Sequence, residues 1–262
     1  MRRLSSGVLN ARRAAVGPLE PIEELRLRTL AVPVALVIAA LFSRSQLGHA
    51  IQRMVFGMPL HELGHALTAI ALGVPAIPLL WFTPMGDHRS PVLVVLLLAG
   101  ATTLGVLGRW AGRRSWTVTG SALGTVVLLG LLVGDRPARA LIVFCGDAGA
   151  MVLGTLLIST VFSGEGSPFR KGGLRWGLLV VGAAAFSDVA STWWAARHDP
   201  GEIPLGQLET GGLSDASVLV DTFGWTEQAL VGRYVAVAGL CLGALAVLWI
   251  VRGLRPLRQA RS

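Results

Sequence analysis

The stretch GMPLHELGHALTAIALG at 57–73 carries two histidines and a glutamate among apolar residues. His61 and His65 are four positions apart, so on a helix both imidazoles leave the same face and can bind one ion. Glu62 lies about 100° further around such a helix, within reach of a water molecule bound to that ion. The spacing therefore predicts a Zn²⁺ site with His61 and His65 as metal ligands.

The predicted chemistry is hydrolysis. Zn²⁺ held by two histidines and a carboxylate keeps one position for water, whose pKa falls to about 7. Glu62 is then the predicted catalytic base, which takes the proton of that water and passes it to the leaving amine. A structural role for Glu62 is less favourable in a membrane, where an acidic side chain without a partner costs about 2.5 kcal/mol or more.

The third metal ligand has to come from another part of the chain, and three aspartates are candidates. Asp188, in AAAFSDVASTWW, lies deep in an apolar run and ranks first, because a charge at that depth requires a partner. Asp147, in FCGDAGAMVLG, and Asp215 are the alternatives and rank nearly equal. Asp215 also has a structural explanation, since an acid in the first turn of a helix is favoured by the helix dipole.

The remaining histidines and the cysteines have simpler interpretations. His49, His88 and His198 lie in or beside predicted loops and are interpreted as solvated interface residues. Cys145 and Cys241 fall inside apolar runs, where a small apolar side chain suffices, and no disulfide is expected.

These residues belong to a chain with the composition of an integral membrane protein. Of its 262 residues, 53% are hydrophobic and 15% are charged. Because about 20 helical residues span a hydrocarbon core of about 30 Å, the long apolar runs predict membrane crossings. The runs lie at 90–108, 116–133, 138–161, 174–196 and 229–251. Without strand-like alternation, they predict an all-α, polytopic transmembrane helical bundle.

Two weaker segments, 29–42 and 59–82, leave the number of crossings open. Arginines gather before 29, after 108 and at the end of the chain, whereas the 197–228 loop is acidic and should face away from the cytoplasm. This pattern is consistent only if one of the two segments crosses. We therefore predict about six crossings with both termini cytoplasmic, in a bacterial cytoplasmic membrane. The motif helix, between Pro59 and Gly73, is predicted to be re-entrant or to continue as a broken helix through 82.

The predicted organisation is a cytoplasmic N-terminal tail over 1–28, a membrane-embedded metalloprotease-like domain over 29–251, and a basic cytoplasmic tail over 252–262. Within the domain, the non-cytoplasmic loop 197–228 contains GGLSDASVL, read as a turn and a helix start capped by Ser214. The lipid bilayer is the expected surrounding. The net charge of +8 is sorted by loop, so it does not predict a nucleic-acid partner.

Several of these segments resemble the site-2 protease family of intramembrane zinc metalloproteases, in particular its compact branch of bacteria, fungi and plants. LHELGHAL at 60–67 is similar to that family's HExxH helix, and LAGATTLGVLG at 98–108 to the helix of small residues that follows. AAAFSDVAS and GGLSDASVLVDTFGW resemble later segments whose aspartates correspond to Asp188 and Asp215. The family's Asn-Pro-Asp-Gly or Leu-Asp-Gly ligand motif is absent.

The leading functional hypothesis is an intramembrane zinc metalloendopeptidase that cleaves a transmembrane protein substrate. One alternative is a divalent-metal transporter or sensor that uses the same His and Asp groups, although the sequence shows no row of polar residues beyond the site. Another is a non-catalytic membrane scaffold.

Overall fold

A computed structural model of the chain describes residues 21–164, 166–207 and 212–259. Over these residues the fold is helical and contains no strand, and Ala76 and Met85 form an isolated antiparallel bridge. The helices are α2 (Pro21–Phe42), α3 (Gln46–Ile51), α4 (Met58–Ala71), α5 (Pro91–Trp110), α6 (Arg114–Leu132), α7 (Asp135–Ser159), α8 (Leu174–Ala196), α9 (Asp215–Ser217), α10 (Glu227–Trp249) and α11 (Arg255–Gln259).

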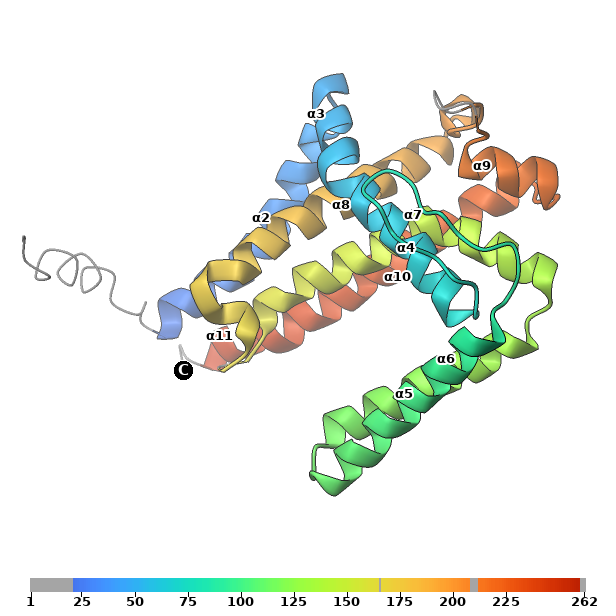
Figure 1. Cartoon of the computed structure of the whole chain (residues 1–262). Coiled ribbons are helices and arrows are strands. Elements are labelled where there is room, and N and C mark those ends of the chain that lie inside the picture. The colour runs from blue at the N-terminus through green and yellow to red at the C-terminus, as the bar shows by residue number, and fades with distance from the viewer. Residues whose placement is uncertain (1–20, 165, 208–211, 260–262) are drawn as a thin grey trace, which may run out of the picture.

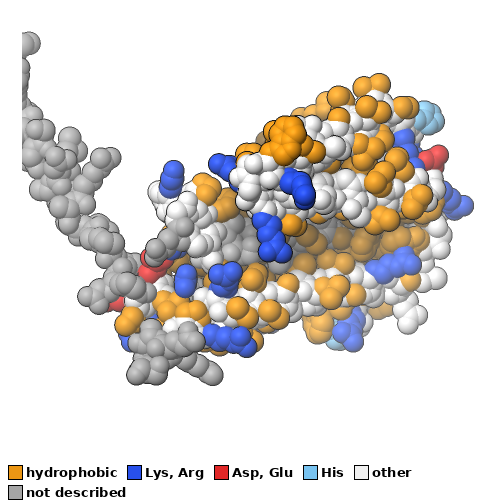
Figure 2. Space-filling view, turned by 90° about the horizontal axis from the view of Figure 1, so that it is seen from below, with side chains coloured by type: hydrophobic (Ala, Val, Ile, Leu, Met, Phe, Trp, Pro, Cys, Tyr) orange, Lys and Arg blue, Asp and Glu red, His pale blue; other side chains and the backbone are white. Residues whose placement is uncertain are grey.

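The polytopic helical bundle predicted from the apolar runs is confirmed. Within the described parts of the chain, six helical stretches are long and apolar enough to cross a membrane: Ile22–Phe42, Pro91–Trp110, Arg114–Leu132, Asp135–Phe162, Pro168–Ala196 and Glu227–Leu257. Their outward faces are rich in exposed aliphatic side chains, such as Leu132 and Leu240. Figure 2 shows hydrophobic side chains interspersed with arginines on one face of the molecule. The chain is therefore an integral membrane protein.

The first crossing is longer than the apolar run that predicted it. Helix α2 begins at Pro21, so residues 21–28, assigned to the N-terminal tail, are helical, while 1–20 lie outside the described residues. Glu23 and Glu24 in the first turn suit a helix N-terminus. Glu24 also pairs with Arg170 and, at 3.1 Å, with Arg175. Ion pairing thus extends the helix beyond the hydropathy boundary.

The second weak segment does not cross the membrane as a single helix. Helix α4 has 14 residues and ends at Ala71, close to the predicted limit, and Gly73 follows with a φ of 81°. Glycine adopts this left-handed conformation without strain, so it ends the helix. Residues 72–90 then run without regular secondary structure to α5. Helix α4 is accordingly the short embedded helix, and α2 is the crossing.

A continuous helical path leads into the motif. Helix α3 passes directly into a π-helical turn over Gln52–Gly57, which passes directly into α4. Buried Gln52 anchors the turn, since its amide nitrogen donates to the carbonyl of Ala39 in α2 at 3.1 Å and its oxygen accepts from Ser43. Such turns add a residue to a helix and are frequent at functional sites.

Helix α7 is the centre of the bundle. It packs against α4, α8 and α10, and α8 also packs against α2 (Figure 1). Helices α5 and α6 pack mainly against each other and project from the remaining helices as a hairpin (Figure 1). The motif helix is thus supported chiefly by α7.

Glycines allow α4 and α7 to approach closely. A Cβ atom added to Gly64 would lie 2.2 Å from the carbonyl oxygen of Cys145, and one added to Gly149 would lie 2.6 Å from the Cα of Gly64. Small residues on both helices permit backbone contact of this kind inside a membrane. The contact lies next to His65 and so fixes the distance between the motif and α7.

We expect Gly64→Ala to destabilise the protein, because the added methyl group has no space against α7. Overpacking of this kind costs about 1–3 kcal/mol. Thermal unfolding in detergent should show a lower midpoint for this variant. Gly239→Ala in α10 is the matched control, since no atom lies within 4 Å of the added Cβ and its midpoint should not fall. Equal midpoints for the two variants would contradict the close crossing.

Candidate metal site

His61 and His65 face one point, as their spacing predicts. Both side chains are buried, and their Nε2 atoms are 3.0 Å apart. Gly146 of α7 makes room for them, because a Cβ atom there would lie 2.5 Å from a ring atom of each histidine. The imidazoles therefore lie against the backbone of α7.

Asp215 supplies the third side chain of the group. Its Oδ2 lies 3.0 Å from the Nε2 of His61 and 3.0 Å from that of His65. It is in the first turn of α9, and Ser214 caps this helix by accepting a hydrogen bond from the Ser217 amide at 3.2 Å, as predicted. Among the described residues, these three side chains form a group that could hold a metal ion.

The geometry of this triangle fits a metal ion. Ligand atoms about 2.0–2.2 Å from a tetrahedral Zn²⁺ are separated by about 3.3 Å. The three observed separations of 3.0 Å are close to that value. Two imidazole nitrogens and one carboxylate oxygen are a suitable donor set for Zn²⁺ and related divalent ions.

Hydrogen bonds on the opposite ring nitrogens favour metal binding. His61 Nδ1 lies 2.8 Å from Asp147 Oδ1, and His65 Nδ1 lies 2.8 Å from the carbonyl oxygen of Ile142. Both partners are acceptors, so each Nδ1 carries the proton and each neutral ring directs an Nε2 lone pair at Asp215. Asp215 Oδ2 is buried and has no hydrogen-bond donor. Three converging lone pairs repel each other unless a cation lies among them.

Asp147 orients His61 and is not itself one of the three converging groups. Its Oδ2 accepts a hydrogen bond from the indole of Trp193 at 2.8 Å, and its Oδ1 also accepts one from Arg53 at 3.1 Å. Trp193 stacks on Tyr234 with ring centroids 4.0 Å apart. The carboxylate is therefore fixed in position behind the imidazole, as carboxylates commonly are behind metal-binding histidines.

Asp188, ranked first as the third ligand, lies elsewhere. It is completely buried in α8, and its Oδ1 is 2.7 Å from His49 Nδ1. A buried carboxylate needs a partner, as the sequence analysis assumed, but the partner of Asp188 is His49 and not the pair His61 and His65. His49 is correspondingly not just a solvated interface residue, although its side chain is 47% exposed.

Glu62 is buried but does not belong to the converging group. The hydroxyl of Thr83, in the segment between α4 and α5, lies 2.7 Å from Glu62 Oε2 and donates to it. The carboxylate is thus attached to the segment that covers α4.

Arg53, from the π-helical turn, pairs with Asp147, whose Oδ1 lies 3.1 Å from Arg53 Nη1. Burial opposes its charge, but the carboxylates of Asp147 and Asp188 outweigh that effect and raise the pKa of Arg53 above its ordinary value. Nothing in the sequence motif indicates this arginine. Its position depends on the π-helical turn, which the sequence does not reveal.

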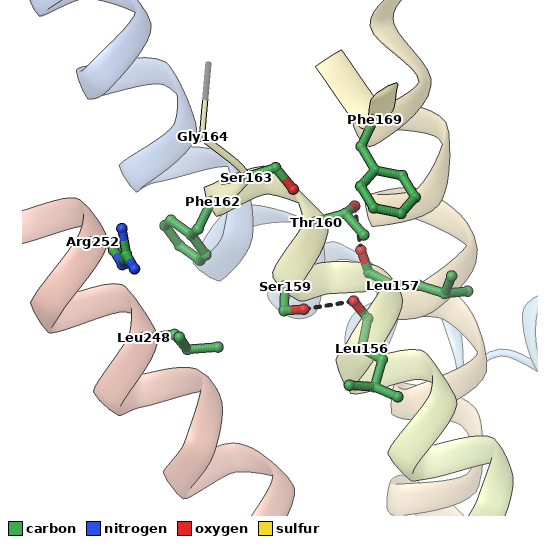
Figure 3. A pocket seen from close by; sticks show the side chains of 10 residues that line it. All are labelled: Leu156, Leu157, Ser159, Thr160, Phe162, Ser163, Gly164, Phe169, Leu248 and Arg252. Carbon is green, nitrogen blue, oxygen red and sulfur yellow. Dashed lines mark hydrogen bonds between the residues drawn. The ribbon is translucent and has the colours of Figure 1, made fainter. Parts of the chain in front are cut away.

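A cavity of about 540 Å³ lies away from the metal group, beside the C-terminal end of α7 (Figure 3). Leu156, Phe162, Leu248 and Arg252 are among its lining residues. Ser159 and Thr160 donate hydrogen bonds to backbone carbonyls one turn earlier, both at 2.6 Å. Their hydroxyls are already used by the helix, so the cavity does not present the converging polar groups of a reactive site.

Comparison with known proteins gives functional information through the name of a relative. No family model and no solved structure matches the chain. A chloramphenicol resistance protein from Streptomyces lividans is 35% identical over 146 residues, which cover 53% of this chain and 36% of the relative. The chain thus matches about a third of the length of that relative.

This comparison overturns the protease hypothesis. The relative's name refers to drug resistance and not to proteolysis, so the comparison gives no support to a peptidase. The motif spacing was sufficient to predict converging histidines, but the same ligands suit metal binding without hydrolysis. The predicted transmembrane protein substrate depends on the protease interpretation alone.

We expect metal content to distinguish the roles of the three aspartates. Asp215→Asn and His65→Ala remove a ligand and should lose most of the bound Zn²⁺. Asp147→Asn should weaken zinc affinity about 10–100-fold, as is usual when the partner of a metal-bound histidine is changed. Asp188→Asn should retain the ion. Elemental analysis and competitive titration of the purified variants check this, and loss of zinc in Asp188→Asn with retention in Asp215→Asn would reverse the assignment.

Proposed function

We propose that this chain is a membrane transport protein for a divalent metal ion, with His61, His65 and Asp215 as its transit site and Zn²⁺ as the preferred ion. The observation that carries the proposal is the 3.0 Å triangle of three lone-pair atoms, which calls for a cation between membrane-embedded helices. In this function the metal is the transported substrate.

The uneven support of the three ligands suits an ion that has to be released. The histidine side chains are each 8% exposed and lie on a helix packed against α7. The Asp215 side chain is 30% exposed and lies at the start of α9, which continues directly into a π-helical turn over Val218–Thr222. Asp215 is therefore the ligand most accessible to solvent, and an exchanging ion would leave the site on its side.

We also propose an orientation for the chain. The arginines before and within α2, after α5 and after α10 favour the cytoplasmic side, with both termini there and six crossings between them. The acidic segment before α10 then lies on the opposite side, and the metal site opens toward it. A bacterial cytoplasmic membrane suits this arrangement.

The resistance relative gives additional support. Its name refers to resistance to chloramphenicol, and transport across the membrane is one physical route to such resistance. Export of chloramphenicol is therefore the second candidate function for this chain, favoured by that relationship alone.

We expect the purified full chain in proteoliposomes to carry Zn²⁺ down a zinc gradient, as detected by an enclosed zinc-sensitive dye. His61→Ala and Asp215→Asn should reduce the initial rate about tenfold or more, because each variant removes a ligand. Glu62→Gln should retain transport, since Glu62 is outside the metal group.

Expression in a chloramphenicol-sensitive host provides the comparison for the second candidate. Zinc flux without increased chloramphenicol resistance supports the metal transporter. Increased resistance without zinc flux, or a zinc flux that is identical in the ligand variants and in empty liposomes, would contradict it.

A further inference from the structure

Next to the metal site is a buried charge cluster that metal binding does not use. Arg53 donates a hydrogen bond to Asp147 Oδ1 at 3.1 Å, and the carboxylates of Asp147 and Asp188 both raise the pKa of Arg53. One cation between two carboxylates leaves one negative charge unmatched. Inside a membrane protein such a charge is costly, so a proton or another cation has to balance it.

Asp188 is the carboxylate with the unmatched charge. Asp147 accepts hydrogen bonds from Trp193 and Arg53 and pairs with His61. Asp188 is 0% exposed, and both of its carboxylate oxygens are buried without a hydrogen-bond partner among the described residues. The charged group nearest to it is His49, whose Nδ1 lies 2.7 Å from Asp188 Oδ1.

His49 gives this buried acid access to the surface. It lies on α3, and 47% of its side chain is exposed, whereas the Asp188 side chain is not exposed at all. An imidazole can accept a proton on one ring nitrogen and release one from the other. A proton can therefore pass between the exposed side of His49 and Asp188 without opening the bundle.

The charged neighbours of Asp188 are few and define its electrostatic environment. Helix α7 contributes Asp147, the π-helical turn contributes Arg53, and α3 contributes His49. Residues 29–42 of α2 include no titratable side chain, and on the α10 side Tyr234 faces Trp193 and donates to the carbonyl of Phe144. The negative charge of Asp188 thus depends on His49 and Arg53.

We propose that His49 and Asp188 form a proton-binding pair that exchanges one proton with the surface when the divalent ion binds. This rests on the proposed transport function and deepens it, since it makes the proton the counter-ion of metal transport. The proton is held between His49 Nδ1 and Asp188 Oδ1, which lie 2.7 Å apart. When the metal binds, it adds positive charge beside Asp147. The charge of Arg53 is then less needed at Asp147 and stabilises ionised Asp188 instead. The proton leaves Asp188 through the exposed imidazole of His49. Only N–H and O–H bonds change, and one proton leaves for each bound ion.

The test counts protons released on metal binding, by titration calorimetry of the detergent-solubilised full chain with ZnCl₂ in two buffers of different ionisation enthalpy. We expect Asp188→Asn to bind one Zn²⁺ as the wild type does and to release about one proton fewer per ion, because coupling between two sites is reciprocal. His49→Gln should show the same deficit. Asp221→Asn, which changes an exposed acid outside the cluster, is the matched control and should release the wild-type number.

Each outcome decides a separate point. A wild-type proton count in both variants overturns the pair and leaves transport standing. A deficit of about one proton without zinc flux in liposomes supports the pair and overturns transport, while no zinc binding by the wild type overturns both. Should Asp188→Asn fail to fold, His49→Gln decides alone, because 47% of the His49 side chain is exposed and glutamine keeps a polar group at that position.

Discussion

The close contact between α4 and α7 is the constraint on which the site depends. With glycines at 64, 146 and 149, the two backbones approach until the imidazoles lie directly against α7. At that distance the Ile142 carbonyl and the Asp147 carboxylate reach the Nδ1 atoms, and the Nε2 lone pairs are left facing Asp215. Bulkier residues at the crossing would separate the rings from the groups that fix their tautomers. The glycines at the α4–α7 crossing thus determine which nitrogen of each histidine is free to bind a metal ion.

The sequence predicted the architecture well because membrane crossing depends on local composition. Five apolar runs gave five crossings within a few residues, and Gly73 marked the end of the motif helix. The start of α2 was placed late because Glu24 is stabilised by Arg175, a contact that is distant in sequence. The paired histidines followed from a spacing of one helical turn. Boundaries and ligands that depend on local sequence could therefore be predicted, and those that depend on folding could not.

The third ligand illustrates this limit. The cost of burying a charge correctly indicated that Asp188 needs a partner, but it does not say which partner. That choice depends on the π-helical turn packing against α8, which brings His49 to Asp188, and on the segment before α10 folding back over α7, and both are tertiary contacts. The Ser-Asp pair at 214–215 did mark a helix start, but a cap that has no role in metal binding explains that pattern equally well. The function prediction failed for a similar reason, since a motif specifies ligands and leaves open what the bound ion does.

The π-helical turn at Gln52–Gly57 has an evolutionary consequence. A π turn contains one residue more than an α-helical turn, and successive helical residues differ by about 100° in direction. Deleting a single residue there would restore regular winding and swing α3 around the axis of α4, carrying His49 away from Asp188. Natural relatives that keep both histidines of the motif but shorten this turn should therefore have lost the buried aspartate or its imidazole partner as well. The length of six residues therefore matters for the site alongside the side chains of Gln52 and Arg53.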